Sequence, residues 1–289
     1  MYMTKNDSTV KIGQATATVV ALSYSPETWQ EIVTWELVYP RYIHSELLTH
    51  RAFSRNAASS RATPVAAMIK EVRENPCFFD EIRHNQKGMT GGELVDPAKA
   101  AVFREQWRAM ADLAARFAEE WGVENGIAKQ TVNRILEPFS FIRTLVTATD
   151  VDNFFELREA EDAQPEMRSL AKAMRCSMEK AERRHPADGG TAGLLHLPYG
   201  DLIEETDAEE RIIRSVAACA RVSVMRGDGK KTTLKEDYEF VKRLYENQHM
   251  SPFEHVAKAS RHEGRYYNLR DWVSLRYVRD MGCCFLFDE

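Results

Sequence analysis

The sequence contains no apolar run long enough to cross a membrane, since no stretch approaches the roughly 20 apolar residues that a spanning helix needs. Its first residues, MYMTKND, are polar where a secretory signal would carry an apolar core. The five cysteines are odd in number and irregularly spaced, which is typical of reduced thiols rather than of a disulfide framework. We therefore expect a cytoplasmic protein.

A large excess of one charge is also absent. Lys and Arg number 39 against 44 Asp and Glu, for a formal net charge of −5. This argues against a protein that coats nucleic acid by bulk charge, although local arginine clusters can still hold small phosphates. The 289 residues, of which 44% are hydrophobic and 29% charged, suit one large globular domain or two small ones.

Three signatures of common enzyme classes are missing. The sequence has no HExxH, no glycine-rich loop of the P-loop or Rossmann type, and no G-x-S-x-G turn. Their absence disfavours an NTPase, a Rossmann dehydrogenase and a hydrolase. His249 and His255 lie six residues apart with Glu254 between them, but Pro252 interrupts a helical pair and no cysteine is near, so we predict no metal site.

What the sequence does contain is the hydrophobic periodicity of a mixed α and β chain, with more helix than strand. Strands are predicted at 15–24 and 32–39. The second strand alternates and places one set of large residues on a single face: Val33, Trp35, Leu37 and Tyr39. Residues 56–64 are interpreted as a loop or a frayed helix end, and residues 185–200 as a connector.

Helices are predicted over residues 43–50, 97–121, 127–136, 165–180, 212–220 and 233–245. The longest begins at an Asp96 cap with Pro97 in its first turn, and it ends at Gly122. Its apolar residues recur at steps of three and four: Phe103, Trp107, Met110, Ala114, Phe117 and Trp121. So regular a stripe indicates core or a subunit interface rather than a cofactor site.

The segment with the most reactive chemistry is THRAFSRNAASSR, residues 49–61. Four of its thirteen residues carry hydroxyls and three are arginines. Arginine forks bind phosphates in bidentate fashion, and hydroxyls and backbone N–H groups complete such sites. By composition alone, a solvated helix end explains the segment equally well.

Three shorter segments have chemistry of their own. Arg134 lies in an apolar run and needs a partner, for which Glu137 is the candidate, and on spacing alone a structural ion pair is the favoured interpretation. Asn153 and Arg158 are five residues apart and share a helix face only loosely. Residues 196–199, HLPY, are interpreted as an ordered surface loop in preference to a lid over a site.

Together these segments resemble the flavin-dependent thymidylate synthases (ThyX). The family hallmark is R-H-R, then seven residues and Ser, with an internal Ser and Asn and a closing Arg. The residues that match it are His50, Arg51, Ser54, Asn56, Ser59 and Arg61.

Four further blocks support the resemblance. A-R-I-V-L-P resembles NRILEP at 133–138, and N-F-L-x-L-R with H-A-Q resembles NFFELR at 153–158 with AQ at 163–164. A-A-R-V-S resembles CARVS at 219–223, and H-x-S/T-P-F-E-H resembles HMSPFEH at 249–255. Five matches in one chain are specific, and they span most of its length apart from the long helix and the connector.

The order of the blocks is unusual. In ordinary members the last two blocks precede R-H-R, whereas here they follow everything else, so the chain resembles a rearranged, phage-type member. A permutation requires the old termini to lie close together, and we therefore expect the C-terminal third to pack against the first strands. We expect one ThyX-like unit, with residues 1–185 as the flavin and nucleotide half, 186–210 as connector and 211–289 as the S-P-F-E-H half.

The resemblance implies an α+β fold in which helices flank an antiparallel sheet, and a homotetramer with shared active sites. It implies FAD as cofactor, a pyrimidine deoxynucleoside monophosphate as substrate, methylenetetrahydrofolate as carbon donor and NADPH as reductant. It assigns to FAD the residues His50, Arg51, Asn153, His249 and Ser251. It assigns to the nucleotide the residues Ser59, Arg61, Arg134 and Arg158, of which Arg134 and Arg158 are also catalytic.

Five positions depart from the family pattern. They are Glu46 for Gln, Thr49 for the first Arg, Ala57 for Glu, Ala62 for Tyr and Asp162 for His. Because a hydrogen-bonding pocket rejects mismatched analogues strongly, such changes can switch the base from uracil to cytosine. Glu46 or Asp162 would then face the cytosine amino group.

The leading hypothesis is a thymidylate synthase that methylates dUMP at C5, cytoplasmic, or in the host cytoplasm if phage-encoded. The alternative within the same class is a methylase or hydroxymethylase of dUMP or dCMP for modified phage DNA. A third hypothesis, from another class, is a nucleic-acid-binding module, and an inactive homologue is the fourth. The third would use Arg41, Arg51, Arg55 and Arg61 as one basic strip, but nothing comparable extends that strip, so no nucleic-acid partner is expected.

Overall fold

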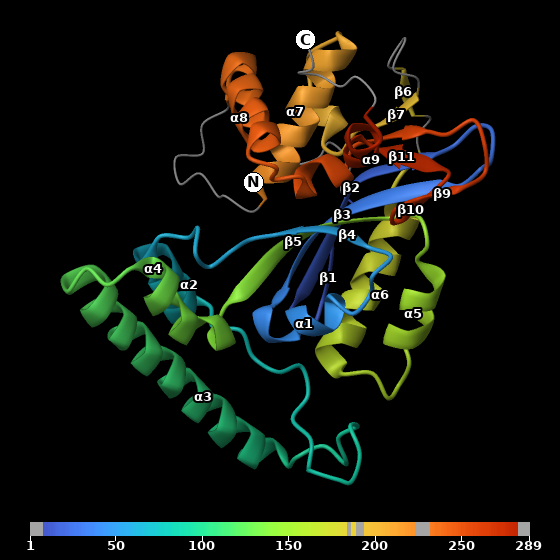
Figure 1. Cartoon of the computed structure of the whole chain (residues 1–289). Helices are drawn as coiled ribbons and strands as arrows, with labels where there is room; N and C mark the ends of the chain where they lie inside the picture. The colour runs from blue at the N-terminus through green and yellow to red at the C-terminus, as the bar shows by residue number, and fades with distance from the viewer. Residues whose placement is uncertain (1–7, 184–185, 189–193, 223–231, 283–289) are drawn as a thin grey trace.

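The computed structural model describes residues 8–183, 186–188, 194–222 and 232–282. Its central element is a five-stranded antiparallel sheet with the strand order β1-β2-β3-β5-β4 (Figure 1). The strands are β1 (Val10–Ile12), β2 (Ala15–Tyr24), β3 (Glu31–Pro40), β4 (Ser54–Ala57) and β5 (Phe141–Ala148). An antiparallel sheet flanked by helices confirms the predicted fold class.

Helices α5 (Asp152–Arg158) and α6 (Pro165–Lys180) cover one face of this sheet (Figure 1). The predicted face of β3 points towards them, and its large side chains are buried. Trp35 is fully buried, and its indole N–H donates to the Met174 carbonyl and to Ser177 Oγ, both at 3.2 Å. Alternation therefore correctly predicted which side of β3 faces the core.

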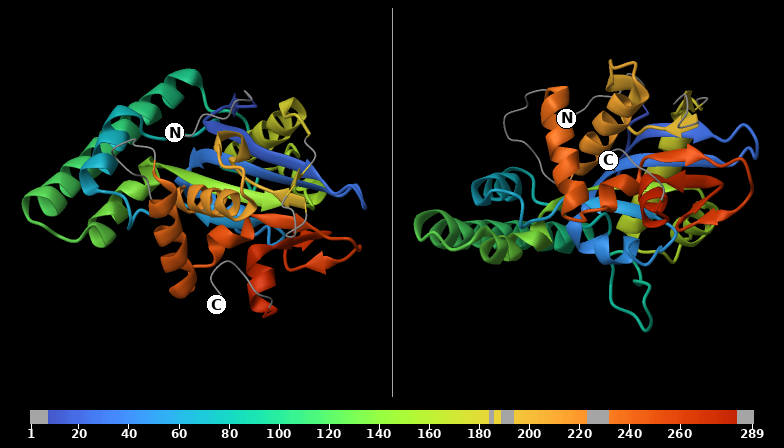
Figure 2. Two further views of the ribbon diagram at one scale, coloured as in Figure 1. Left: turned by 90° about the horizontal axis from the view of Figure 1, so that it is seen from above. Right: turned by 45° about the horizontal axis from the view of Figure 1, so that its top comes forward.

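The C-terminal third covers the opposite face (Figure 2). It contributes helices α7 (Ala208–Arg221) and α8 (Leu234–Glu246) and most of a four-stranded sheet with the order β11-β8-β7-β6. These strands are β6 (Ala187–Asp188), β7 (Leu194–His196), β8 (Ala257–Ala259) and β11 (Trp272–Ser274). Ile32 of β3 packs in one cluster with Trp272 of β11, so the predicted return of the C-terminal third onto the first strands is confirmed.

A buried chain of polar side chains joins the two sheets. His196 bonds Ser23 through Nδ1 at 2.9 Å and Thr34 through Nε2 at 2.8 Å. Thr34 contacts Thr147 at 2.6 Å, and Thr147 contacts His255 Nδ1 at 2.8 Å. All these hydrogen-bonding groups lie out of solvent, so each ring must stay neutral to avoid an uncompensated buried charge.

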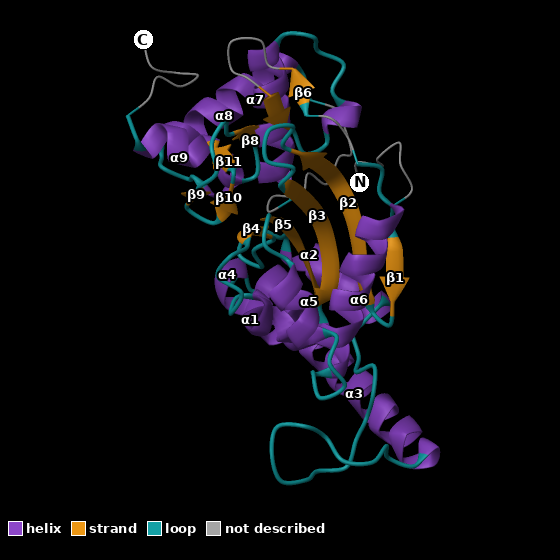
Figure 3. Cartoon of the chain, turned by 90° about the vertical axis from the view of Figure 1, so that its right-hand side faces the viewer, coloured by secondary structure: helices purple, strands orange, loops and turns teal. Residues whose placement is uncertain are grey.

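Helix α3 (Pro97–Ala118) extends away from the sheets beside α2 (Val65–Glu74) (Figures 1 and 3). As predicted, the Asp96 carboxylate accepts from two backbone N–H groups of the first turn. The predicted stripe is core only in part, since Ala114 is buried and Trp107 packs against the same cluster, and the residues that α3 buries completely are alanines. Its exposed large apolar side chains are Val102, Phe103, Met110, Leu113 and Phe117, and Trp121 follows in the π-helical turn η2 (Glu119–Glu124).

The structure differs from the predicted elements at three places. Asn56 and Ala57, predicted as the start of a loop or a frayed helix end, belong to edge strand β4 (Ser54–Ala57), because β5 supplies hydrogen-bonding partners for their backbone. Residues 129–139 form a short helix, α4 (Lys129–Val132), followed by the 3-10 helix η3 (Asn133–Phe139), which continues through Pro138. Residues 196–199 form neither surface loop nor lid, since His196 and Tyr199 are buried between the layers.

The remaining C-terminal elements are the 3-10 helix η6 (Ser251–Glu254), β9 (Arg265–Tyr266), β10 (Leu269–Arg270) and α9 (Leu275–Asp280). None of the helices in the described ranges combines the length and apolar character that a membrane crossing requires.

Candidate functional site

Strand β4 lies at the edge of the central sheet, and several of the predicted site residues lie at its two ends. At the first end, Arg158 Nε donates to His50 Nε2 at 2.8 Å, and Arg158 Nη2 donates to Thr49 Oγ1 at 3.2 Å. The His50 ring meets Phe154 edge to face, with 4.8 Å between centroids. We call His50, Thr49, Arg158 and Phe154 the His-Arg cluster.

The electrostatics of the His-Arg cluster keep its imidazole neutral. Burial, together with the guanidinium groups of Arg158 and Arg55, lowers the pKa of His50 to about 4. A neutral ring can present a lone pair at Nε2, which is the atom that accepts from Arg158. Thr49, where the family has Arg, thus serves as a second acceptor for the same guanidinium.

Glu46 lies near this cluster, and burial raises the pKa of its carboxyl while the charge of Arg158 opposes that shift. Asp162, the other carboxylate considered for a cytosine amino group, is exposed on the loop before α6. Glu46 is thus electrostatically coupled to Arg158, a predicted site residue.

The middle of β4 meets the C-terminal motifs. Asn56 Nδ2 donates to the Cys219 carbonyl at 2.7 Å, and Ser251 Oγ lies 3.5 Å from Asn56 Oδ1. The R-H-R, A-R-V-S and S-P-F-E-H blocks therefore meet at one strand, although they are up to 195 residues apart in sequence. Ser223, the last residue of the A-R-V-S block, lies outside the described residues.

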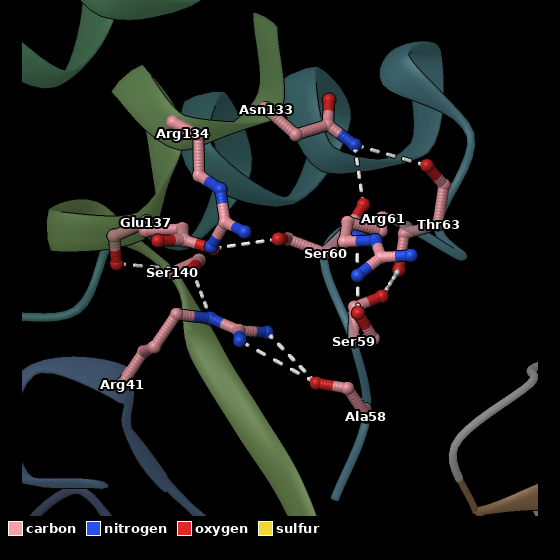
Figure 4. Close-up of polar contacts among 10 residues, drawn as sticks. All are labelled: Arg41, Ala58, Ser59, Ser60, Arg61, Thr63, Asn133, Arg134, Glu137 and Ser140. Carbon is pink, nitrogen blue, oxygen red and sulfur yellow. Dashed lines mark hydrogen bonds and ion pairs between the residues drawn. The ribbon is translucent and has the colours of Figure 1, made fainter. Parts of the chain in front are cut away.

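The second end of β4 holds a group of charged and hydroxylic side chains that we call the Ser-Arg cluster (Figure 4). Its members are Arg41, Ser59, Ser60, Arg61, Arg134 and Glu137. Glu137 Oε1 accepts from Ser60 Oγ at 2.6 Å and from Arg134 Nη1 at 2.9 Å. The predicted ion pair between Arg134 and Glu137 is therefore present, and Ser60 shares it.

Arg41 is one of three members, with Ser60 and Glu137, that the sequence analysis did not assign to the nucleotide site. Its guanidinium donates to Ser140 Oγ at 3.2 Å and to the Ala58 carbonyl at 3.4 Å and 3.5 Å. Burial lowers its pKa, while the carboxylates of Glu137 and Glu71 oppose that shift. In the sequence, Arg41 stands out as an arginine directly after Pro40, which ends a strand. Without the fold, that position is weak evidence for a binding site.

Hydrogen bonds between side chains and backbone groups shape the loop that carries Ser59 and Arg61. The amide of Asn133 donates to the Ser60 carbonyl at 2.7 Å and to the Thr63 carbonyl at 3.0 Å (Figure 4). The N–H of Arg61 donates to Ser59 Oγ at 3.3 Å, and both residues are exposed. The loop is thus anchored from η3 while Ser59 and Arg61 face solvent.

Arg51, Asn153 and His249 are exposed, and their side chains form no hydrogen bond or ion pair within the described part of the chain. They therefore keep all their hydrogen-bonding groups for a ligand or another subunit. The basic strip proposed for nucleic acid is not continuous, because Arg41 and Arg55 bond backbone carbonyls of their own chain.

The predicted nucleotide residues fall into two groups within one chain. Arg158 belongs to the His-Arg cluster, whereas Ser59, Arg61 and Arg134 belong to the Ser-Arg cluster. The four residues of β4 between the two clusters span roughly 10 Å from the first Cα to the last when extended. Within one subunit these residues therefore form two separate clusters.

A cavity of about 370 Å³ lies beside the Ser54 end of β4, between that strand and the C-terminal segment. Its walls include the rings of Tyr266 and Tyr267 and the ion pair of Glu254 with Arg276. Asn268 on its rim lies 3.4 Å from Ser54 Oγ. The cavity combines aromatic faces with charged groups, as small-molecule sites commonly do.

A sequence model of one protein family, described as thymidylate synthase complementing protein (Thy1), matches residues 29–186, which is more than half of the chain. This range contains both clusters but ends before Arg221 and the 249–255 block. No curated protein matches the chain.

Several solved structures are similar to the chain. The flavin-dependent thymidylate synthase ThyX from Helicobacter pylori, complexed with FAD and dUMP, is 21% identical with a TM-score of 0.37, and the match covers 50% of this chain and 66% of that one. A second structure of that enzyme is 20% identical with the same TM-score and is covered over 65% of its length. The UMP/dUMP methylase PolB from Streptomyces cacaoi, bound with 5-Br UMP, is 14% identical with a TM-score of 0.45, covering 57% of this chain and 89% of that one. The chain thus spans less than two thirds of the Helicobacter pylori chains.

Proposed function

The chain belongs to the thymidylate synthase complementing protein (Thy1) family, and from this premise we propose that it is a flavin-dependent thymidylate synthase. Membership confirms the predicted family resemblance. In the proposed reaction, a methyl group replaces the hydrogen at C5 of dUMP. Its carbon comes from methylenetetrahydrofolate, and NADPH is the source of the electrons that reduce it to the methyl level. The observation that carries the proposal is that the family match contains both polar clusters at the ends of β4.

Three exposed side chains suit a flavin nucleotide in their chemistry. Arg51, Asn153 and His249 offer guanidinium, amide and imidazole groups that are unused within the described residues. Such donors match carbonyl oxygens and a diphosphate. We propose that they hold FAD together with His50 and Ser251, and that bound reduced FAD supplies the hydride.

The Ser-Arg cluster suits the phosphate of the nucleotide. Ser59 and Arg61 face solvent, and Arg134 uses one N–H group on Glu137 while its side chain remains 58% exposed. An arginine has five N–H donors in a planar fork, so Arg134 can bind a phosphate without releasing Glu137.

Arg158 is proposed to orient the pyrimidine ring and to stabilise negative charge that develops on its carbonyl oxygens. His50 and Thr49 accept from two N–H groups of the guanidinium, Nε and Nη2, so its direction is set before a ligand arrives. The neutral His50 ring adds no repulsion to that guanidinium.

The separation of the two clusters supports an active site shared between subunits. A second copy that places its Arg158 near this chain's Ser-Arg cluster would complete the predicted set of nucleotide ligands. The exposed apolar face of α3 offers a surface for such an assembly. We therefore retain the homotetramer as part of the proposal.

Two of the three described cysteines, Cys77 and Cys219, are unsuited to act as a thiol nucleophile. Burial raises the pKa of Cys77 to about 12 and also raises that of Cys219, so both thiols stay protonated near neutral pH. Neither is exposed to a ligand, because both are fully buried. Activation of C5 by cysteine addition is therefore disfavoured at these positions.

A second candidate function is the related methylation or hydroxymethylation of dCMP. The coupling of Glu46 to Arg158 favours it, because a carboxylate can accept from a cytosine amino group but not from a uracil carbonyl.

The test is a visible absorption spectrum of the purified protein, followed by titration with dUMP and dCMP. We expect a flavin spectrum, perturbed by dUMP, and conversion of dUMP when methylenetetrahydrofolate and NADPH are added. Arg61→Gln should lose nucleotide binding and keep the flavin, whereas the matched Arg116→Gln on α3 should keep both. A colourless protein that cannot bind added FAD would refute the proposal, and turnover of dCMP alone would favour the second candidate.

A further inference from the structure

We propose that Glu137 determines the phosphate specificity of the Ser-Arg cluster, making it select a nucleoside monophosphate over a diphosphate. The inference rests on the proposed function, because it assumes that a pyrimidine nucleotide binds at this cluster. It assigns a role to a carboxylate that lies inside an otherwise cationic site.

The geometry places the Glu137 carboxylate where an anion would otherwise sit. One oxygen, Oε1, accepts both from Ser60 Oγ at 2.6 Å and from Arg134 Nη1 at 2.9 Å (Figure 4). A hydroxyl and a guanidinium that converge on one oxygen are typical partners of a phosphate oxygen. Glu137 therefore fills one anion position from within the chain.

The carboxylate also sets the charge that remains for a ligand. The cluster holds three guanidinium groups, from Arg41, Arg61 and Arg134, and one carboxylate, for a net charge of +2. Two further charges lie at its margin and cancel: Lys129, whose Nζ donates to the Ala62 carbonyl, and Glu71, which accepts from the Phe141 N–H. A phosphomonoester carries close to two negative charges near neutral pH, so the balance fits a monophosphate.

A second phosphate group would bring additional negative charge towards the Glu137 carboxylate. The side chain of Glu137 is 25% exposed, so solvent screens this repulsion only in part. Ser60 and Arg134 are already engaged with Glu137 and have fewer free donors for a second phosphate. Charge and donor count therefore both disfavour the diphosphate.

The test compares the binding of dUMP and dUDP to the full-length protein by titration calorimetry. Wild type should bind dUMP more tightly than dUDP. Glu137→Gln keeps an acceptor oxygen for Ser60 and Arg134 but removes the charge, and it should shift the affinity ratio towards dUDP at least tenfold, about 1.4 kcal/mol. Glu137→Asp, which keeps the charge, should retain most of the wild-type preference.

The matched control is Glu119→Gln, which makes the same change of charge in an ion pair with Arg73 outside the cluster. Its affinity ratio should stay within about twofold of wild type. An equal shift in Glu119→Gln, or an unchanged ratio in Glu137→Gln, overturns the inference and leaves the proposed function standing. Wild type that binds dUDP as tightly as dUMP overturns it without any variant, should Glu137→Gln not fold. Wild type that binds neither nucleotide overturns the proposed function together with the inference.

Discussion

Acidification from pH 7 to pH 5 should destabilise the fold through two histidines that are buried in neutral form. His196 and His255 are completely inaccessible, and threonine and serine hydroxyls join them between the two sheets. Burial lowers the pKa of each ring to about 3, and for His196 the proximity of His255 adds to the shift. Among the residues that the structure describes, no carboxylate bonds either ring to compensate for a proton.

The magnitude follows from the difference in proton uptake between the two states. The pKa of an unfolded histidine is about 6.5, so between pH 3 and pH 6.5 the unfolded chain binds more protons than the folded one. Stability is therefore complete above pH 6.5 and falls as the pH decreases towards 3. At pH 5 the loss is about 2 kcal/mol for each ring, or about 4 kcal/mol for both.

Guanidinium chloride unfolding at pH 7 and pH 5 measures this loss. His255→Gln should reduce the drop in the free energy of unfolding between the two pH values by about 2 kcal/mol, because one titrating site is gone. His84→Gln, at an exposed position, should leave the drop unchanged. Burial also lowers the pKa of His44 and His50, so the comparison rests on differences between variants rather than on the total drop. The same drop in His255→Gln as in wild type would refute the reasoning.

Three further outcomes follow from the contacts described above. Arg158→Lys should reduce kcat/KM by at least tenfold with an unchanged melting temperature, because an ammonium cannot reach His50 and Thr49 with the fork geometry of a guanidinium. The control is Arg175→Lys, and equal losses of kcat/KM in both variants would contradict the role assigned to Arg158. Trp35→Ala should cost about 3–5 kcal/mol in chemical denaturation, since the side chain is fully buried and bonds two groups of α6, and a loss below 1 kcal/mol would contradict its place in the core. Phe117→Glu, on the exposed face of α3, should lower the mass measured by light scattering if that face joins subunits, and an unchanged oligomer would exclude this face as the interface.

Local patterns in the sequence determined several elements correctly. Alternation predicted β3 and its buried face, a 3.6-residue period predicted α6, and side-chain caps predicted the start of α3 and of α8. The motifs also predicted the family and brought together residues that the fold does place near β4. These features depend on neighbours within a few residues, which is why the sequence alone reveals them.

Other features depended on partners that are distant in the sequence. Strand β5 is buried on both faces and therefore shows no clear alternation, and β4 is a strand only because β5 pairs with it. Arg41 joins the Ser-Arg cluster because η3 and the Ala58 carbonyl lie beside it in the fold. His196 was predicted to lie in a surface loop, yet it is buried between the sheets, where it bonds Ser23 and Thr34. These partners are 173 and 162 residues away in the sequence, so no local pattern could reveal them. A local pattern specifies which face of a helix or strand a residue occupies. Only the tertiary structure decides which distant residues pack against that face.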